Sequence, residues 1–207
     1  MAERTLDGGV ASRSSRSTAS PMALFFREFL RHPAMIGSII PSSRRTIEAM
    51  LSDVRWDETR LFVEYGPGVG TFCDTILERL SPDATLLVID TNPVFVDFVR
   101  RRYADSRFIA VHGSAADVQD IIATHGFESA DYILSGLPFS TLPAGVGARI
   151  AEQTFAALSP GGSFLIYQYS PNVLRLLAPH FTRVDRSFEW FNIPPCHLLK
   201  ARKPAEP

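Results

Sequence analysis

The chain has 207 residues and a formal net charge of −1, with 45% hydrophobic and 21% charged residues. This composition is ordinary for one globular domain with its own core, and it excludes a wholly disordered chain and a polycation that binds nucleic acid through charge alone. Its longest apolar run is far shorter than the ~20 residues of a membrane-spanning helix, and its two cysteines lack metal-ligand spacing, so we expect neither a span nor a metal site.

The N-terminal region divides into a polar tail and an amphipathic segment. Residues 1–20 are rich in Ser and Arg and cannot bury a core, which predicts a disordered tail, with an organelle transit peptide as the alternative. Residues 22–32, which begin with Met22 and end with His32, place apolar side chains on one arc of a helix and charged ones on the other. Such a helix can lie on a membrane but is too short to cross it, and its apolar face could also pack on the domain. We expect residues 21–58 to form a helical segment that faces membrane and substrate.

A second helix is expected to begin near Ser42 or Ser43, because either side chain can cap its first turn. From residue 59 to 207, strand and helix patterns alternate. Strands are expected at residues 61–65, 85–90, 108–112, 131–135, 163–169, 181–188 and 196–201, and helices at 71–80, 93–103, 118–124, 143–158 and 171–177. This alternation predicts an α/β fold with a seven-stranded, mostly parallel sheet and helices on both faces.

A glycine-rich turn follows the first expected strand and carries the strongest functional signal. It reads Glu64-Tyr65-Gly66-Pro67-Gly68-Val69-Gly70. Glycines let the backbone approach a ligand closely, and doubly wound sheets bind nucleotides at the carboxyl ends of their strands. Asp90 ends the next strand, where its carboxylate can accept hydrogen bonds from both hydroxyls of a ribose. The alternative is a tight turn without a ligand.

The spacing of this turn selects the kind of nucleotide. Dinucleotide folds use G-x-G-x-x-G, whereas this chain has G-x-G-x-G. Glu64 would repel a pyrophosphate, but it suits a ligand that carries an ammonium and a sulfonium. At these residues the chain resembles the class I S-adenosylmethionine-dependent methyltransferases, whose first motif reads E/D-x-G-x-G-x-G and whose domain is Rossmann-like.

This resemblance implies S-adenosylmethionine as the cofactor and a role for each matching position. Glu64 would lie near the methionine amino group, and Asp90 would hold the ribose hydroxyls. The other implied contacts are Tyr65, Gly66 and Gly68 along the methionine and ribose, Thr91, Asn92, Ser114 and Ala115 around the adenine, and Ser135 facing the sulfonium.

The segment after the fourth expected strand, Ser135-Gly136-Leu137-Pro138-Phe139, bears on the methyl acceptor. Methyltransferases that act on the adenine amino group have N/D-x-P-Y/F here, where the polar side chain grips the amino group and the aromatic ring stacks on the base. Gly136 occupies the Asn position and has no side chain to do so. RNA adenine methylation is therefore kept only as an alternative function.

A closer resemblance covers nearly all of residues 22–203. Four segments, F-L-R-H-P-A-M-I-G-S-I-I-P-S-S, V-E-Y-G-P-G-V-G-T-F, S-G-L-P-F and W-F-N-I-P-P, resemble those of the bacterial phospholipid N-methyltransferases. The resemblance implies stepwise methylation of phosphatidylethanolamine towards phosphatidylcholine, and it makes Ser42 and Ser43 cofactor contacts. A lipid-binding module without catalysis is the third possibility.

The lipid substrate also sets the expected partners and location. We expect a monomer that binds an anionic membrane through residues 22–32, on the inner face of the cytoplasmic membrane, and that does not bind nucleic acid. For the proton that leaves the amine, the candidate acceptors are Tyr167, Tyr169 and the backbone carbonyl of Leu137. The two tyrosines share one face of a strand and could also hold a methylated cation. Cys73 is expected to be a small core residue.

Overall fold

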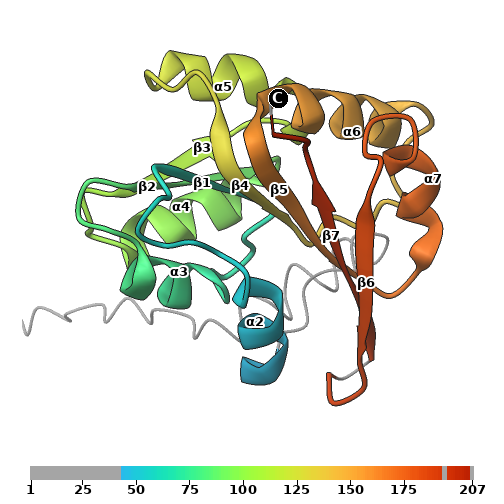
Figure 1. Cartoon of the computed structure of the whole chain (residues 1–207). Helices are drawn as coiled ribbons and strands as arrows, with labels where there is room; N and C mark the ends of the chain where they lie inside the picture. The colour runs from blue at the N-terminus through green and yellow to red at the C-terminus, as the bar shows by residue number, and fades with distance from the viewer. Residues whose placement is uncertain (1–42, 193–194, 206–207) are drawn as a thin grey trace, which may run out of the picture.

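The computed structural model describes residues 43–192 and 195–205, and its centre is one twisted seven-stranded sheet (Figure 1). The strands are β1 (Leu61–Tyr65), β2 (Thr85–Asp90), β3 (Phe108–His112), β4 (Ala130–Ser135), β5 (Leu158–Gln168), β6 (Val184–Glu189) and β7 (Cys196–Arg202). They lie in the order β3-β2-β1-β4-β5-β7-β6. β7 alone runs opposite to the other six strands of this sheet, so the predicted mostly parallel α/β sheet is confirmed.

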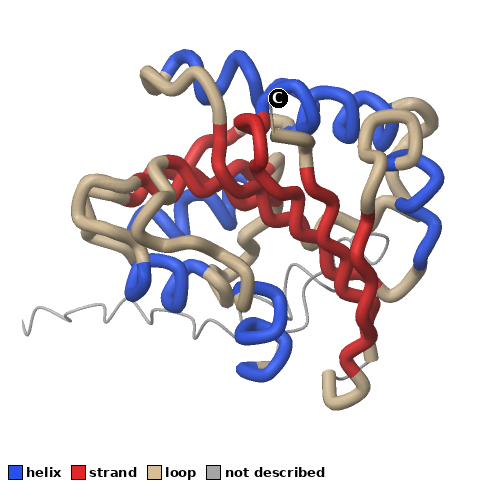
Figure 2. Tube along the Cα trace, in the orientation of Figure 1, coloured by secondary structure: helices blue, strands red, loops and turns tan. Residues whose placement is uncertain are grey.

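Helices cover both faces of the sheet, as the tube in Figure 2 shows. They are α2 (Arg44–Leu51), α3 (Cys73–Arg79), α4 (Pro93–Arg102), α5 (Val118–Thr124), α6 (Val146–Ala157) and α7 (Leu174–Leu177), with the 3₁₀ turns η2 (Ala115–Asp117) and η3 (Pro171–Val173). Two hydrophobic clusters result: one lies under α5 and α6, and the other under α2, α3 and α4. Every residue of β1 is buried, as expected for a strand covered on both faces.

Several element boundaries differ from the expected ones for local reasons. The helix expected from residue 143 begins at Val146, because Gly145 has a φ of 82° and cannot be helical. β5 begins at Leu158, five residues before the expected start, and its pairing with β4 shifts between Ala130 and Tyr132. The helix expected at residues 171–177 opens as the 3₁₀ turn η3, and β6 begins three residues later than expected.

Some expectations fall outside the described residues. These are the tail of residues 1–20, the amphipathic helix of residues 22–32, and Ser42. Within residues 43–192 and 195–205, no helix combines the length and the apolar character of a membrane span.

The order of the strands determines where a ligand can bind. β1 lies between β2 and β4. After β1 the chain adds β2 and β3 on one side of that strand, and it then crosses to add β4 on the other side. The register pairs Tyr65 with Ser135 and Asp90 with His112, so these strands end at one edge. Such a switch point is where open α/β sheets bind ligands.

Candidate functional site

The glycine turn after β1 has the backbone geometry that its sequence predicts. Gly66, Gly68 and Gly70 have φ values of 65°, 56° and 85°, which only glycine adopts without strain. The hydroxyl of Tyr103 donates to the carbonyl of Gly70 at 2.9 Å, and it occupies the space that a side chain at Gly70 would need. Tyr103 thus fixes one end of the turn. This role could not be predicted from the sequence.

Glu64 lies beside this turn and is buried. Its pKa is raised to about 7, mainly by burial and to a smaller extent by the nearby Asp90, while a hydrogen bond from Cys73 opposes the rise. The Cys73 thiol donates to Oε2 of Glu64 at 3.2 Å, so Cys73 is more than the small core residue expected. A buried carboxyl without a cationic partner is the group that a ligand's ammonium would stabilise in its charged form.

Asp90 connects the turn to the start of α4. Its Oδ1 accepts a hydrogen bond from the backbone N–H of Asn92 at 2.8 Å. Burial raises the pKa of Asp90 to about 6, against hydrogen bonds from the amides of Asn92 and Gly68 and the charge of His112, which lower it. The carboxylate therefore stands at the switch point, as the sequence predicts for the group that holds a ribose.

Tyr65 does not present its side chain to this edge. The ring is fully buried in the cluster under α6, and its hydroxyl lies 3.0 Å from Oγ1 of Thr154. Neighbouring residues of a strand point to opposite faces, so Tyr65 and Glu64 cannot both face one ligand. The expected contact of Tyr65 with the methionine and ribose stays a prediction, and it would have to be made by the Tyr65 backbone.

The other polar residues predicted around the cofactor cap their own loops. Each side-chain oxygen accepts a hydrogen bond from a backbone N–H two or three residues later: Asn92 from Val94 at 2.9 Å, Ser114 from Ala116 at 3.1 Å, Ser135 from Leu137 at 3.2 Å and Ser43 from Thr46 at 3.2 Å. The carbonyl of Thr91 lies 3.1 Å from Nε2 of His112, and Ala115 is buried. These residues shape the loops at the edge of the sheet.

The loop after β4 explains why glycine stands at position 136. A Cβ at Gly136 would collide with the hydroxyl and ring of Tyr167 from the neighbouring strand β5. Tyr167 in turn stacks on Phe72, with ring centroids 5.0 Å apart. The Tyr167 ring therefore occupies the space where adenine methyltransferases carry their polar side chain, and Gly136 is the residue that permits it.

The three candidate proton acceptors also lie beside this loop. The carbonyl of Leu137 already accepts hydrogen bonds from Nε2 of Gln168 at 2.6 Å and from the N–H of Phe139 at 2.9 Å. Because a carbonyl oxygen has two lone pairs, Leu137 could accept the proton only if one of these hydrogen bonds broke, and its role as the acceptor stays a prediction. Burial raises the pKa of Tyr169 to about 12 and that of Tyr167 well above the ordinary value, so neither phenol ionises near neutral pH.

Asn192, which follows β6, connects this part of the chain to the start of α2. Its side-chain oxygen accepts hydrogen bonds from the N–H of Ser43 and from the hydroxyl of Thr46, both at 3.1 Å. The structure thus brings together two of the segments that carry the family resemblance, P-S-S and W-F-N-I-P-P. This long-range contact could not be predicted from the sequence.

Comparison with curated proteins shows the family. No family model matches the sequence. An ornithine lipid N-methyltransferase from Singulisphaera acidiphila is 31% identical over 174 residues, which are 83% of this chain and 91% of that enzyme. The chain belongs to this family of lipid N-methyltransferases. A ribosomal RNA small subunit methyltransferase H from Psychrobacter is also 31% identical, but over 103 residues that make up only 30% of that enzyme.

Solved structures show the same fold. The N-methyltransferase NodS from Bradyrhizobium japonicum, in complex with S-adenosyl-L-homocysteine, matches with a TM-score of 0.58 and 18% identity over 87% of this chain and 88% of that one. The precorrin-6y C5,15-methyltransferase from Geobacter metallireducens matches with a TM-score of 0.63 and 14% identity over 78% and 89%. These structures confirm the class I methyltransferase fold, and membership of the lipid N-methyltransferase family supports S-adenosylmethionine as the cofactor.

The residues of this lipid N-methyltransferase fit that cofactor. Gly66 and Gly68 carry no side chain of their own, so their backbone can be approached closely, and the carboxyls of Glu64 and Asp90 flank it on β1 and β2. Both carboxyls have raised pKa values. A ligand's ammonium beside Glu64 would lower the pKa of that carboxyl, and hydroxyls that donate to Asp90 would lower the pKa of the other. The donor set matches a ligand with an ammonium at one end and a ribose at the other.

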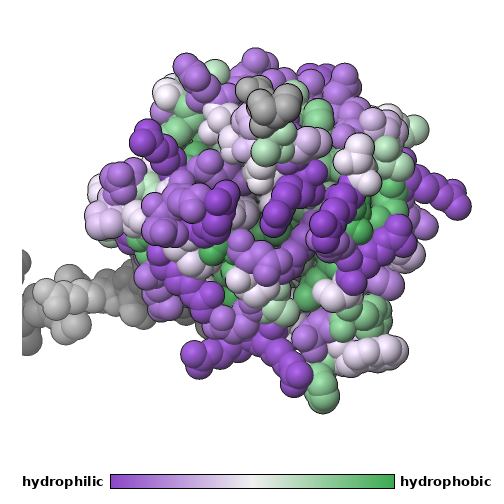
Figure 3. Space-filling view, viewed as in Figure 1, coloured by the Kyte–Doolittle hydropathy of each residue, from purple (hydrophilic) through white to green (hydrophobic). Residues whose placement is uncertain are grey.

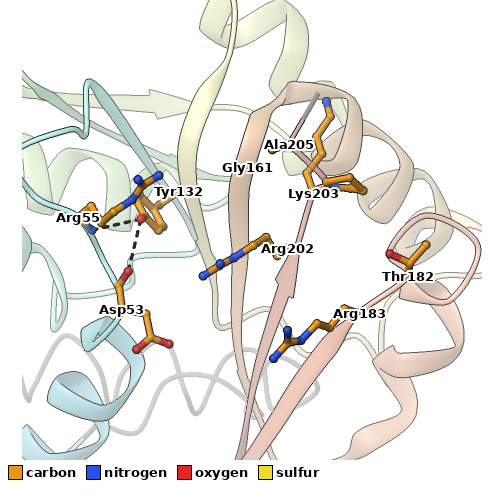
Figure 4. Close-up of a pocket in the computed structure, with 10 residues that line it drawn as sticks. Asp53, Arg55, Tyr132, Gly161, Thr182, Arg183, Arg202, Lys203 and Ala205 are labelled. Atoms are coloured by element: carbon orange, nitrogen blue, oxygen red, sulfur yellow. Dashed lines mark hydrogen bonds between the residues drawn. The ribbon is translucent and has the colours of Figure 1, made fainter. Parts of the chain in front are cut away.

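A cavity of about 510 Å³ lies at the opposite end of the strands (Figure 4). It is bounded by Tyr132 near the start of β4, by Gly161, and by Arg202 at the end of β7. In Figure 3, hydrophilic side chains surround a hollow on this face. Arg55 pairs with Glu58 at 2.6 Å, Arg183 with Asp185 at 3.0 Å, and Lys203 donates to the carbonyl of Leu158 at 2.6 Å. This cavity is separate from the edge that carries the glycine turn.

Proposed function

We propose that this protein transfers methyl groups from S-adenosylmethionine to the amine of phosphatidylethanolamine, and then to its mono- and dimethyl products, at the inner face of the cytoplasmic membrane. The single observation that carries the proposal is the packing of Tyr167 against Gly136. It puts an aromatic ring, instead of a side chain that grips adenine, next to the end of β4. The family membership supports a lipid amine as the acceptor.

The same loop argues against adenine as the acceptor. Phe139, the residue that would stack on a base, is buried in the core cluster under α6. A Cβ at Gly147 of α6 would lie 3.4 Å from the Phe139 ring, so this ring packs against the helix. A base would have to displace Phe139 from the core before it could stack.

Cofactor binding is assigned to the two carboxyls at the switch point. When bound, the cofactor supplies an electrophilic methyl group on a sulfonium. Glu64 holds the amino end of the cofactor and Asp90 holds its ribose hydroxyls, while the glycine turn lets the backbone lie against it. These residues would hold the cofactor in one orientation, and in-line transfer would require the acceptor amine to be held about 3–3.5 Å from the reacting carbon.

The acceptor amine must lose a proton before it can attack. An alkyl amine has a pKa of about 10.4, so the neutral form costs about 4–5 kcal/mol near neutral pH. Desolvation beside a cationic sulfonium offsets part of this cost. The rings of Tyr167 and Tyr169 stay neutral, and their faces stabilise the cation that each methylation leaves behind. The departing proton passes to water at the open edge beside the partly exposed Tyr169.

Ornithine lipid is a second candidate acceptor. The relative from Singulisphaera acidiphila is named for that substrate, and this chain matches 91% of its length. Both candidates offer an amine at a membrane surface, so the chemistry assigned to Tyr167 and Tyr169 serves either one.

The experiment that tests the proposal uses methyl-labelled S-adenosylmethionine. The full chain is incubated separately with vesicles containing phosphatidylethanolamine, with vesicles containing ornithine lipid, and with RNA, and the Asp90→Ala variant is the inactive control. The expected result is label in phosphatidylethanolamine that depends on Asp90. If only ornithine lipid is labelled, ornithine lipid is the methyl acceptor. If only RNA is labelled, a lipid acceptor is refuted.

A further inference from the structure

The connection between β6 and β7 carries an exposed aromatic pair. Trp190 and Phe191 are 73% and 69% exposed, and they are the large apolar side chains that the described part of the chain leaves at the surface. In Figure 1 this end of the β6–β7 hairpin extends away from the sheet beside α2. Two adjacent aromatic rings at such a position are unfavourable in water unless another surface covers them.

The local structure holds these rings in place. Trp190 makes an edge contact with Phe188, with ring centroids 4.4 Å apart, and Phe188 contacts His197 of β7 at 4.8 Å. The N–H of Phe191 donates to Oε1 of Glu189 at 3.0 Å. Because the rings are already ordered, little further conformational freedom is lost when they bind a partner.

The charge around the pair is arranged asymmetrically. The guanidinium of Arg45 lies over the Phe191 ring, 4.6 Å from its centroid, and the Arg45 side chain is 67% exposed. Its counter-ion Glu189 lies 3.8 Å away and is only 10% exposed. Arg44, in the same first turn of α2, is also exposed. The surface therefore presents cations and aromatic rings outward and keeps its anion inside.

The position of this surface relates it to the reaction. β5 and β6 both pair antiparallel with β7, so they run in the same direction and end at the same edge of the sheet. That edge also contains the glycine turn after β1 and the loop after β4. Asn192, the next residue after Phe191, is bonded to Ser43 at the start of α2, which fixes the pair relative to Arg44 and Arg45.

We propose that Trp190 and Phe191, with Arg44 and Arg45, form a docking tip that inserts into the surface of an anionic lipid bilayer. Tryptophan and phenylalanine favour the interface between headgroups and acyl chains, and arginine beside them is attracted to anionic lipids. Docking at this edge brings lipid headgroups to the cofactor. The inference rests on the proposed function in one respect, namely that a membrane supplies the substrate.

The chain contains two tryptophans, which allows a direct test. In the Trp56→Phe variant, Trp190 is the only tryptophan. With vesicles containing anionic lipid, its emission should shift to shorter wavelength, and lipids brominated on their acyl chains should quench it. Vesicles of phosphatidylcholine alone should produce a much smaller effect. In the Trp190→Phe variant the remaining Trp56, which is stacked on Phe62 in the core cluster under α2, should show no change.

A second measurement separates docking from catalysis. The double variant Trp190→Ser/Phe191→Ser should bind anionic vesicles about tenfold or more weakly, because two large apolar side chains are lost, and its methyl transfer to vesicles should fall in parallel. Methyl transfer to the same lipid dispersed in detergent should be unchanged, which also shows that the variant is folded.

Three results would overturn the docking tip. The first is a Trp190 spectrum that vesicles do not change. The second is a Trp190 spectrum that shifts with protein concentration alone, which identifies a second copy of the chain as the partner. The third is a Trp190 that is shielded without vesicles and becomes exposed when residues 1–42 are deleted. Failure of all lipid methylation would refute the proposed function, while the fluorescence result would still decide the docking tip.

Discussion

At the scale of single residues, the role proposed for Glu64 makes cofactor binding depend on pH. Its carboxyl has a pKa of about 7 in the protein without cofactor, because burial opposes the charged form. Only the charged form attracts the cofactor's ammonium, and the apparent affinity falls with the fraction of protein that is competent.

We therefore predict that the ionisation of Glu64 alone raises the affinity for S-adenosylhomocysteine, measured by calorimetry, about eightfold from pH 6 to pH 7.5. At alkaline pH the ligand's own amino group loses its charge and affinity falls again. In the Glu64→Gln variant, affinity should be lower and most of this rise should disappear, apart from the smaller contribution of Asp90, whose pKa is about 6. An unchanged pH profile in the variant would remove Glu64 from the amino-group site.

The same carboxyl should destabilise the protein without cofactor at alkaline pH. The pKa of Glu64 is raised from 4.5 to about 7 on folding, so the folded state binds the proton more tightly than the unfolded state. The stability associated with that proton is complete below about pH 4.5 and is lost as pH rises through 7.

We predict that Glu64→Gln raises the free energy of unfolding at pH 8 by up to about 3 kcal/mol and has little effect at pH 4.5. The amide oxygen of glutamine can still accept the hydrogen bond from Cys73, so this contact is kept. Urea unfolding at the two pH values measures the difference. A variant less stable than the wild type at pH 8 would show that the charged carboxyl is stabilised by contacts other than a ligand.

Gly136 provides a test of the acceptor site at the same scale. A methyl group there collides with Tyr167, and overpacking of this kind costs about 1–3 kcal/mol. Gly136→Ala should therefore lower both the melting temperature and methyl transfer. In a Tyr167→Leu background the same substitution should cost less, because the ring has been removed. Equal costs in the two backgrounds, measured by thermal unfolding, would show that residue 136 and Tyr167 do not interact.

At the scale of elements, local patterns were predictable from sequence and long-range contacts were not. The glycine turn could be predicted because backbone with positive φ favours glycine. Asp90 could be predicted because it ends a recognisable strand pattern. Tyr103, which holds the turn, and Asn192, which holds Ser43, act across 33 and 149 residues, and no local pattern encodes such pairs. The burial of the Tyr65 side chain follows from the two-residue period of a strand, which puts it on the face opposite Glu64.

The expected amphipathic helix of residues 22–32 also gives a prediction at this scale. Its Phe-rich arc and arginines predict that deletion of residues 1–31 weakens binding to anionic vesicles. Each large apolar side chain that no longer inserts removes about 1.5–3 kcal/mol before ordering costs are subtracted. Co-sedimentation with vesicles measures the loss, and binding equal to that of the full chain would exclude the helix as a membrane contact. The Trp190→Ser/Phe191→Ser variant in the same assay separates this helix from the docking tip.

At the scale of the whole molecule, the sheet order places the proposed cofactor site and the proposed lipid site at one edge. β1, β2 and β4 end where the cofactor carboxyls and the loop with Gly136 meet, and β5 and β6 end at the same edge with Tyr169 and the docking tip beside them. The charged cavity with Arg202 lies at the other end of the strands. A membrane can thus approach the cofactor edge while the remaining surface stays in water.

The central claim is that this edge methylates a phospholipid amine with a methyl group held by Glu64 and Asp90. The most direct measurement is mass spectrometry of the lipids of a bacterium that makes phosphatidylethanolamine but no methylated derivative, after expression of the wild-type chain or of Asp90→Ala. The account predicts mono-, di- or trimethylated phosphatidylethanolamine with the wild type and none with the variant. An unchanged phosphatidylethanolamine pool in cells that contain folded wild-type protein would contradict it.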